Sequence, residues 1–481
     1  MKIKAFFIFL IIFILGVFVA FSINGNLLQL SNDSDKNEVE VTYPHAQELT
    51  FSPSSKYVKY IGRTVYFNNV CWASMSGSGI EFECEGQYAQ FVAYCENAES
   101  LTSNHKPRIA VYANDELIVD SVLAEKEQLF QVDLSPYDEK AIIKVIKLSE
   151  SMYSAFGIGN IKTFGKKDIK PTDNKKIAIE FIGDSLTAGY GIDEERSHAE
   201  FSTSTENFSK SYAYLLADEL DADYSAVAFS GYGVLSGYTK SGSLNSEDTL
   251  INYYDKAITN INLEGGFPDG WQNTRNYDFV IINLGTNDAS YCYTAERRIE
   301  FTSKYKELLS AVRHFNPEAF ILCVLADVNN SMFPYVKKAA EEFSSENNDI
   351  KIASALIEFD MGVNGSVIDG HPSEQSHINA AQKLSQIIKF ILEPEAYELE
   401  TTLPNSFDTY FGVNEDEQTT NEENGEAVTA DNNETVSETE EASKDEGFSD
   451  AITSASFESS PTTEDITESS DESETSQTTE E

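Results

Sequence analysis

The sequence predicts a chain of several domains, in which an all-β sandwich or jelly roll precedes a three-layer α/β domain and a disordered acidic tail follows. Three observations carry this prediction. Short alternating apolar runs fill residues 51–168, buried strand patterns alternate with helical patterns over residues 172–395, and residues 398–481 have few apolar residues and no period. With 481 residues and 41% hydrophobic content, the chain is long enough to build separate hydrophobic cores.

Residues 1–27 read as a signal peptide or a signal-anchor helix. Lys2 and Lys4 precede Ala5–Ile23, an uncharged run of 19 residues. This run is longer than the roughly 7 to 15 apolar residues of a secretory signal and close to the ~20 that span a bilayer. A weak small-residue cleavage site lies at its end, so a cleaved signal and a retained anchor both stay open. Either one places the rest of the chain outside the cytoplasm, secreted or tethered, and limits membrane contact to this segment.

Residues 28–50 are polar and lack periodicity, so they read as a linker. The alternating runs that follow are broken by Gly, Asn, Asp and Ser, a spacing typical of a β-sandwich. They include Val65–Trp72, Gly79–Cys84, Gln90–Tyr94, Arg108–Tyr112, Gln128–Val132 and Ala141–Leu148. Nothing in this region looks catalytic. Trp72 and the tyrosines would serve as platforms for a sugar, although aromatic residues in sandwiches are more often core.

Five cysteines are too few for a disulfide framework in a chain of this size. Cys71, Cys84 and Cys95 lie close enough in sequence that one bridge among them stays open, whereas Cys292 and Cys323 are expected to be free or buried. None has metal-ligand spacing with histidine, and the sequence indicates no metal and no organic cofactor.

A charged connector with Pro171 introduces strands that alternate with helices, which predicts a parallel sheet covered on both faces, a flavodoxin-like three-layer domain. The strands are expected at Ile177–Ile182, Asp223–Phe229, Phe279–Leu284, Ala319–Ala326 and Lys351–Ile357. The helices are expected at about Ser209–Glu219, Ala295–His314, Phe333–Phe343 and Ser373–Leu392.

Half of the formal charge of −46 lies in the acidic tail, where Thr401–Glu481 contains 24 Asp and Glu against one lysine, Lys444. A segment of this composition cannot bury enough apolar surface to offset its conformational entropy and is predicted to be disordered. The acidic balance argues against nucleic acid or anionic lipid as a partner and suits a neutral polysaccharide. The oligomeric state is not predicted.

The most informative stretch is Ile177–Gly191, in which a β-branched run stops at Gly183 and is followed by Asp184 and Ser185. A serine at the carboxyl end of a central strand projects into the crevice where α/β proteins carry out their chemistry. A helix-capping role for Ser185 is the competing interpretation.

Serine hydrolysis needs a base and donors for an oxyanion, and other strand ends offer them. His371 lies in a turn-rich loop between the last strand and the last helix. Gly231 follows the second strand in a glycine-rich turn with a backbone N–H free to point at a substrate, and Asn287 follows the third strand with a side-chain amide.

Taken in order, Gly183-Asp184-Ser185-Leu186, Gly231, Gly285-Thr286-Asn287-Asp288 and His371-Pro372 resemble the four blocks of the SGNH (GDSL-type) esterase superfamily, a flavodoxin-like hydrolase fold. The resemblance implies that Ser185 is the nucleophile and His371 its base. It also implies that the Ser185 backbone N–H, Gly231 and Asn287 form the oxyanion hole, and it assigns residues 172–395 to an SGNH hydrolase domain.

Most of that superfamily carries Asp three residues before the histidine, where this chain has Ile368, whereas Asp369 lies two before it. This closer spacing, together with the preceding β-domain, is similar to carbohydrate esterase family 2, the acetylxylan esterase type. The resemblance implies a Ser185-His371-Asp369 triad. Some members use a Ser-His dyad with a backbone carbonyl instead, so triad and dyad both stay open.

The resemblance implies an exported esterase that removes O-acetyl groups from plant polysaccharides such as xylan or glucomannan through an acyl-enzyme. A GDSL-type lipase or thioesterase acting on other acyl esters is the alternative enzyme. A non-catalytic polysaccharide-binding surface protein is the alternative from another class.

Overall fold

The computed structural model describes residues 46–95, 98–259, 271, 275–393 and 408–409. The segment predicted as a signal or anchor (1–27), most of the linker and nearly all of the acidic tail lie outside these ranges. Within them, no helix is long and apolar enough to cross a membrane, and the run Ala5–Ile23 does not belong to the residues searched.

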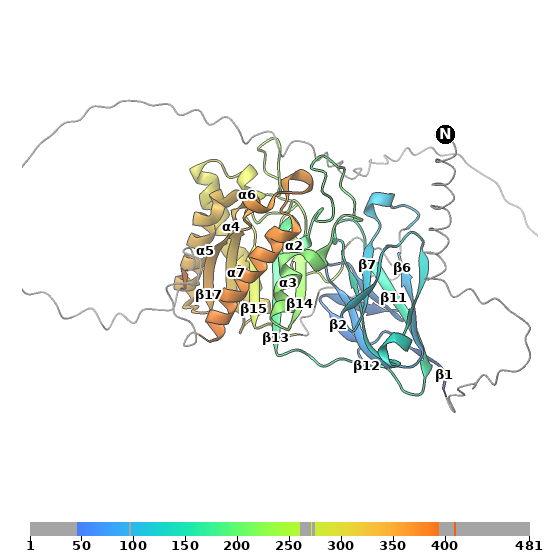
Figure 1. Cartoon of the computed structure of the whole chain (residues 1–481). Coiled ribbons are helices and arrows are strands. Elements are labelled where there is room, and N and C mark those ends of the chain that lie inside the picture. The colour runs from blue at the N-terminus through green and yellow to red at the C-terminus, as the bar shows by residue number, and fades with distance from the viewer. Residues whose placement is uncertain (1–45, 96–97, 260–270, 272–274, 394–407, 410–481) are drawn as a thin grey trace, which may run out of the picture. The chain divides into compact units, whose positions relative to one another are not determined.

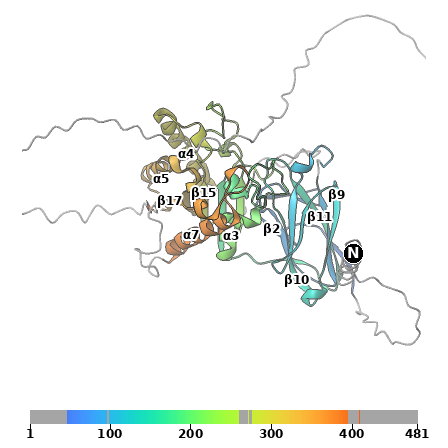
Figure 2. The same cartoon turned by 45° about the horizontal axis from the view of Figure 1, so that its top comes forward.

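Two six-stranded antiparallel sheets form the N-terminal sandwich (Figures 1 and 2). One has the order β3 (Thr64–Phe67), β4 (Val70–Ala73), β11 (Phe156–Gly165), β6 (Tyr88–Tyr94) and β9 (Glu127–Asp133), with β1 (Gln47–Phe51) also paired to β11. The other has the order β12 (Lys170–Pro171), β5 (Gly79–Glu85), β10 (Lys140–Lys147), β7 (Arg108–Ala113) and β8 (Glu116–Val122), with β2 (Lys59–Ile61) on β5. The predicted sandwich is confirmed.

Alternating side chains of the two sheets meet in one core. Ile80 and Phe82 of β5 pack in the same cluster as Phe91 of β6. Trp72 is only 4% exposed, so it belongs to the interior and does not present a sugar platform. The five cysteines carry buried thiols, so the disulfide left open among Cys71, Cys84 and Cys95 is not formed.

Five parallel strands form the sheet of the α/β domain (Figure 1), in the order β14 (Ala222–Ala228), β13 (Ile177–Gly183), β15 (Phe279–Asn283), β16 (Phe320–Ala326) and β17 (Ile352–Ile357). Numbered along the chain, this is the flavodoxin-like order 2-1-3-4-5. The order reverses between β13 and β15, and the carboxyl ends of strands at such a switch point are where doubly wound sheets bind ligands. The predicted fold class is therefore confirmed.

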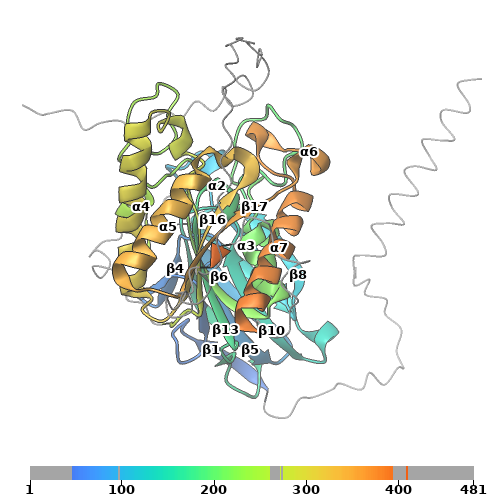
Figure 3. The same ribbon diagram turned by 90° about the vertical axis from the view of Figure 1, so that its left-hand side faces the viewer.

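Helices cover both faces of this sheet (Figure 3). The helices α4 (Ala295–Phe315) and α5 (Phe333–Asn347) pack on one face, and α3 (Tyr212–Glu219) and α7 (Glu374–Leu392) pack on the other. Alternate residues of one strand serve the two faces: Ile281 of β15 joins the α3–α7 cluster, whereas Ile282 joins the α4–α5 cluster. Because both faces are buried, the strands read as continuous apolar runs.

Three short strands lie where the sequence predicts none. The strand β1 begins at Gln47, inside the predicted linker, and β12 occupies the charged connector at Lys170–Pro171. In the predicted disordered tail, β18 (Asp408–Thr409) pairs antiparallel with β17. These strands are short, and their hydrogen-bonded partner strands lie far away in the sequence. Local apolar patterning therefore does not predict them.

A buried ion pair joins the two domains. Arg63, in the turn between β2 and β3, is 0% exposed and donates to Glu180 of β13 at 2.8 Å, and that carboxylate is also 0% exposed. The second carboxylate oxygen accepts from the hydroxyl of Tyr254 at 2.7 Å and from the amide of Asn316 at 3.2 Å. Trp271 lies over the guanidinium, 3.6 Å from the ring centroid. This cluster joins the sandwich to β13, the strand next to the edge strand β14 in the α/β sheet.

Candidate active site

Ser185 is the first residue of a short helix, α2 (Ser185–Ala188), that starts directly after β13. Asp184 caps this helix, and its Oδ1 accepts from the Leu186 N–H at 3.1 Å. Gly183 is required at the strand end, because a Cβ there would lie 2.0 Å from Thr187 Oγ1. The cap belongs to Asp184, so the Ser185 side chain is left for another partner.

That partner is His371, whose Nε2 lies 2.8 Å from Ser185 Oγ. His371 follows a short 3-10 helix, Ile368–Gly370, and its Nδ1 lies 3.3 Å from the Ile368 carbonyl oxygen. A carbonyl only accepts, so Nδ1–H donates to it and leaves the Nε2 lone pair to accept the Ser185 hydroxyl. Burial lowers the pKa of His371 below its usual 6.5, while the charge of Asp369 acts in the opposite direction. The imidazole is therefore neutral at neutral pH, as a general base must be.

Asp369 does not make the contact that a triad requires. Its Oδ2 accepts from the Tyr190 hydroxyl at 3.0 Å, and among the described residues no hydrogen bond joins the Asp369 carboxylate to His371. The backbone of Asp369 is left-handed, with φ of 54°. His371 Nδ1 therefore lies beside the Ile368 carbonyl, as in the dyad alternative, and the role of Asp369 stays a prediction.

Gly231 lies in the turn after β14 with φ of +80°, a conformation that favours glycine. A Cβ at this position would meet nothing within 4 Å, so the turn borders open space. Among the hydrogen bonds of the described residues, none uses the Gly231 N–H as donor. The first N–H of a helix likewise has no partner inside the helix, which applies to Ser185.

Asn287 follows β15 as predicted, but its amide is already engaged. Nδ2 donates to Asp184 Oδ2 at 3.1 Å and to the Tyr232 carbonyl at 2.8 Å. These two bonds use both amide hydrogens. Asn287 therefore joins the loops that follow β13, β14 and β15, and its place as an oxyanion donor stays a prediction.

Asp288, which sequence reasoning did not single out, holds the turn after β14 in place. Its buried carboxylate accepts from the backbone N–H groups of Val234, Leu235 and Ser236 at 2.7–3.2 Å. Burial raises the pKa of Asp288 to about 6, against the effect of these donors. An acidic residue beside Asn287 was visible in the sequence, but its partners lie 52 to 54 residues away along the chain.

Tyr190 also escaped sequence reasoning. Its ring packs on His371 with centroids 4.4 Å apart, and Phe201 packs on its other side at 4.7 Å. Tyr153 and His105, both from the sandwich, continue this stack at 5.1 Å and 4.3 Å. The face of the imidazole is therefore held by an aromatic column that reaches the sandwich.

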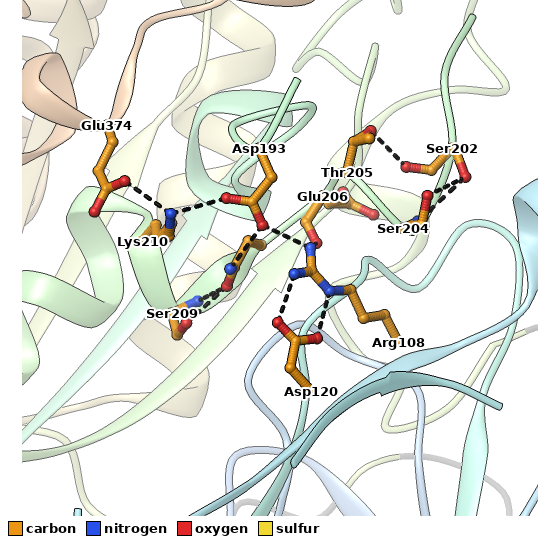
Figure 4. A network of polar contacts seen from close by, with 11 residues as sticks. Arg108, Asp120, Asp193, Ser202, Ser204, Thr205, Glu206, Ser209, Lys210 and Glu374 are labelled. Atoms are coloured by element: carbon orange, nitrogen blue, oxygen red, sulfur yellow. Dashed lines mark hydrogen bonds and ion pairs between the residues drawn. The ribbon is translucent and has the colours of Figure 1, made fainter. Parts of the chain in front are cut away.

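Charged residues connect the same regions (Figure 4). Arg108 of β7 donates to Asp120 of β8 and, at 2.7 Å, to Asp193 in the loop after α2. Lys210 then bridges Asp193, at 2.9 Å, and Glu374 at the start of α7, at 2.8 Å. Glu374 lies three residues after His371, so this chain of ion pairs links the sandwich to the histidine loop.

In the described part of the chain, no group of three or more His, Cys, Asp or Glu side chains is arranged to hold a metal ion. The expectation that no cofactor is needed stays a prediction.

The sequence of the α/β domain is similar to known esterases. Residues 181–377 match the GDSL-like Lipase/Acylhydrolase family. The chain is 29% identical over 251 residues to a cellulase/esterase, CelE, of Acetivibrio thermocellus, a match over 50% of this chain and 28% of that protein. It is 26% identical over 168 residues to an acetylxylan esterase / glucomannan deacetylase of Cellvibrio japonicus, over 32% of this chain and 44% of that protein. The chain thus matches less than half the length of either relative.

Solved structures share the fold of both domains. An acetyl xylan esterase, Est2A, of Butyrivibrio proteoclasticus superposes with a TM-score of 0.64 at 20% identity, over 72% of this chain and 98% of that one. A family two carbohydrate esterase of Clostridium thermocellum, in complex with cellohexaose, superposes with a TM-score of 0.58 at 23% identity. The match covers 70% of this chain and 99% of that one. Residues 181–377 thus resemble the GDSL-like lipases and acylhydrolases, and the chain shares its two-domain fold with solved family two carbohydrate esterases.

Proposed function

We propose that this chain is a serine esterase that removes O-acetyl groups from polysaccharide, with Ser185 as nucleophile and His371 as base. The observation that carries the proposal is the 2.8 Å contact between Ser185 Oγ and His371 Nε2 at the carboxyl edge of the sheet. Removal of the proton from the Ser185 hydroxyl needs a base within hydrogen-bond distance, and the neutral imidazole of His371 is such a base.

In the proposed mechanism, Ser185 Oγ attacks the acetyl carbonyl carbon while its proton passes to His371 Nε2. The carbonyl electron pair moves onto oxygen, where the N–H groups of Gly231 and Ser185 stabilise the negative charge. Collapse of this intermediate breaks the bond to the sugar oxygen, which takes the proton from His371. A water molecule, deprotonated by His371, then attacks the acetyl-serine and releases acetate.

Asn287 would act as a third oxyanion donor only if one of its two present bonds is exchanged for the substrate oxygen. Its bond to the neutral Tyr232 carbonyl is the one we expect to be exchanged, because the bond to Asp184 involves an acid. Burial raises the pKa of Asp184 to about 7, so this carboxyl is partly ionised near neutral pH. A carboxylate is the stronger acceptor of the two.

We infer a dyad in which the Ile368 carbonyl orients His371, and we expect Asp369→Asn to lower kcat by less than about tenfold. Asparagine tolerates the left-handed backbone and still accepts from Tyr190. Loss of the negative charge should lower the pKa of His371, so the acidic limb of the pH profile should move to lower pH. The measurement is kcat/KM with p-nitrophenyl acetate between pH 4 and 9.

A different outcome would restore the triad. If Asp369→Asn reduces kcat by about 10³-fold or more, as loss of the correct histidine tautomer does, then the carboxylate orients His371 after all.

The proposal that the substrate is an acetylated polysaccharide is supported by the names of two relatives, an acetylxylan esterase / glucomannan deacetylase and a cellulase/esterase. The acidic chain suits a neutral sugar polymer. The predicted N-terminal segment would place the enzyme outside the cytoplasm, either secreted or tethered.

We expect p-nitrophenyl acetate to be hydrolysed with a kcat/KM at least about tenfold above that of the octanoate. Acetate release from acetylated xylan and acetylated glucomannan should accompany it. Preference for the octanoate would identify a lipase-like or thioesterase-like enzyme. Tight polysaccharide binding without release of acetate would identify a binding protein.

A further inference from the structure

The segment between β10 and β11 leaves the sandwich and enters the α/β domain. Ser149, Glu150 and Ser151 in this segment are each 0% exposed. Met152 packs against the cluster formed with α4 and α5, and Tyr153 belongs to the aromatic column that ends at His371. A sandwich segment is thus buried beside the candidate active site.

Glu150 contacts the turn that carries Gly231. Its Oε2 accepts from the backbone N–H of Ser230 at 2.6 Å. Its own N–H donates to Glu206 Oε2 at 2.9 Å, so the backbone at Glu150 is itself held. Both glutamates are 0% exposed. A buried hydrogen bond between an N–H group and a carboxyl group has a defined direction and is costly to lose.

This contact matters because of the peptide units around Gly231. The unit before Ser230 is fixed through the Ser230 N–H on Glu150, and the unit after Gly231 is fixed because the Gly231 carbonyl accepts from the Tyr238 N–H at 2.8 Å. The unit between Ser230 and Gly231 carries the Gly231 N–H. Anchoring both neighbouring units therefore restrains the direction of that N–H, and glycine on its own would leave it free to rotate.

We propose that Glu150 is a positioning residue for the oxyanion site: from the sandwich, it holds Ser230 so that the Gly231 N–H meets the charge that develops on the substrate oxygen. This inference rests on the proposed esterase function and assigns part of the catalytic machinery to the sandwich. The sandwich segment and the turn are about 80 residues apart along the chain, as the Glu150–Ser230 bond shows.

The proposed role of Glu150 depends on its hydrogen bond with the Ser230 N–H more than on its charge. Lys147, Glu206 and Asp184 are the buried charged groups that interact with Glu150, and burial raises the pKa of Glu150 to about 7. Burial favours the neutral carboxyl of Glu150, whereas the charge of Lys147 favours the carboxylate. Either form presents an oxygen that accepts the Ser230 N–H.

Two variants separate contact from charge. Glu150→Gln keeps the length and an accepting oxygen but removes the charge, and we expect kcat to fall by less than about tenfold. Glu150→Asp keeps the charge but is one methylene short of Ser230. We expect its kcat to fall by about 10- to 100-fold, approaching the loss of one oxyanion donor, with KM within about twofold because that donor acts on the transition state.

The measurement is kcat and KM with p-nitrophenyl acetate, together with the urea midpoint of each variant to confirm folding. Ser151→Ala is the matched control, because this neighbour is equally buried and bonds Ser74 and Thr259 instead. It should keep kcat within about twofold. A Glu150→Asp variant as active as wild type, equal losses in Gln and Asp, or a change confined to KM would each overturn the inference. Absence of activity in the wild-type chain would overturn the proposed function itself.

Discussion

Replacement of Ser185 by alanine should reduce kcat for p-nitrophenyl acetate and for acetylated xylan by at least about 10³-fold. The variant lacks the oxygen that would form the acyl-enzyme, and His371 Nε2 loses its partner. The fold should persist, because Asp184 caps α2 and alanine is a good helix former at the first helical position. Acetate release and the urea unfolding midpoint, measured on the same preparation, test both statements.

His371→Ala should produce a loss of similar size, because two residues that act as one unit do not contribute additively. Ser303→Ala, on the exposed side of α4, is the matched control and should keep wild-type activity, because its hydroxyl donates to the Ile299 carbonyl of its own helix. Turnover by Ser185→Ala near the wild-type rate would reject Ser185 as the nucleophile.

Replacement of Arg63 by methionine should lower the free energy of unfolding by about 3–5 kcal/mol, because Glu180 would remain as a buried charge without its cation. Tyr254 and Asn316 still donate to Glu180, but these neutral donors compensate a buried charge only in part. Urea unfolding, followed by tryptophan fluorescence and by activity, is the measurement.

The exposed pair between Lys162 and Glu48 provides the control, because its side chains are 43% and 50% exposed. Lys162→Ala should change the free energy of unfolding by less than about 1 kcal/mol. The double variant Arg63→Met, Glu180→Met should recover part of the loss, because no unpaired charge remains. An Arg63→Met variant as stable as the Lys162→Ala variant would show that the ion pair does not hold the domains together.

The place of a candidate active-site residue could be predicted from the sequence when that residue directly follows a strand of the parallel sheet. Parallel strands bring their carboxyl ends to one edge of a sheet, so a serine, a glycine turn and an asparagine after three successive strands are expected to lie together there. Ser185, Gly231 and Asn287 do follow β13, β14 and β15. The loop of His371 was predictable for the same reason, although it lies 186 residues from Ser185.

The direction of each side chain was not predictable, because it depends on which competing partners lie near. Asp369 was expected to reach His371, but the hydroxyl of Tyr190 lies within reach of its carboxylate. The amide of Asn287 was expected to be free, but the Tyr232 carbonyl and Asp184 accept both of its hydrogens. These partners come from other loops, and no spacing along the chain indicates them.

The sequence by itself therefore determined the class of each domain and the order of strands and helices along the chain, and it predicted the sheet edge where the candidate site lies, because periodicity and strand ends are local properties. Only the tertiary structure decided that His371 Nδ1 lies beside the Ile368 carbonyl while the Asp369 carboxylate accepts from Tyr190, and that Glu150 and Arg108 of the sandwich contact the α/β domain. The contacts of Asp369, Glu150 and Arg108 join residues far apart in the chain, so their geometry arises only in the folded protein.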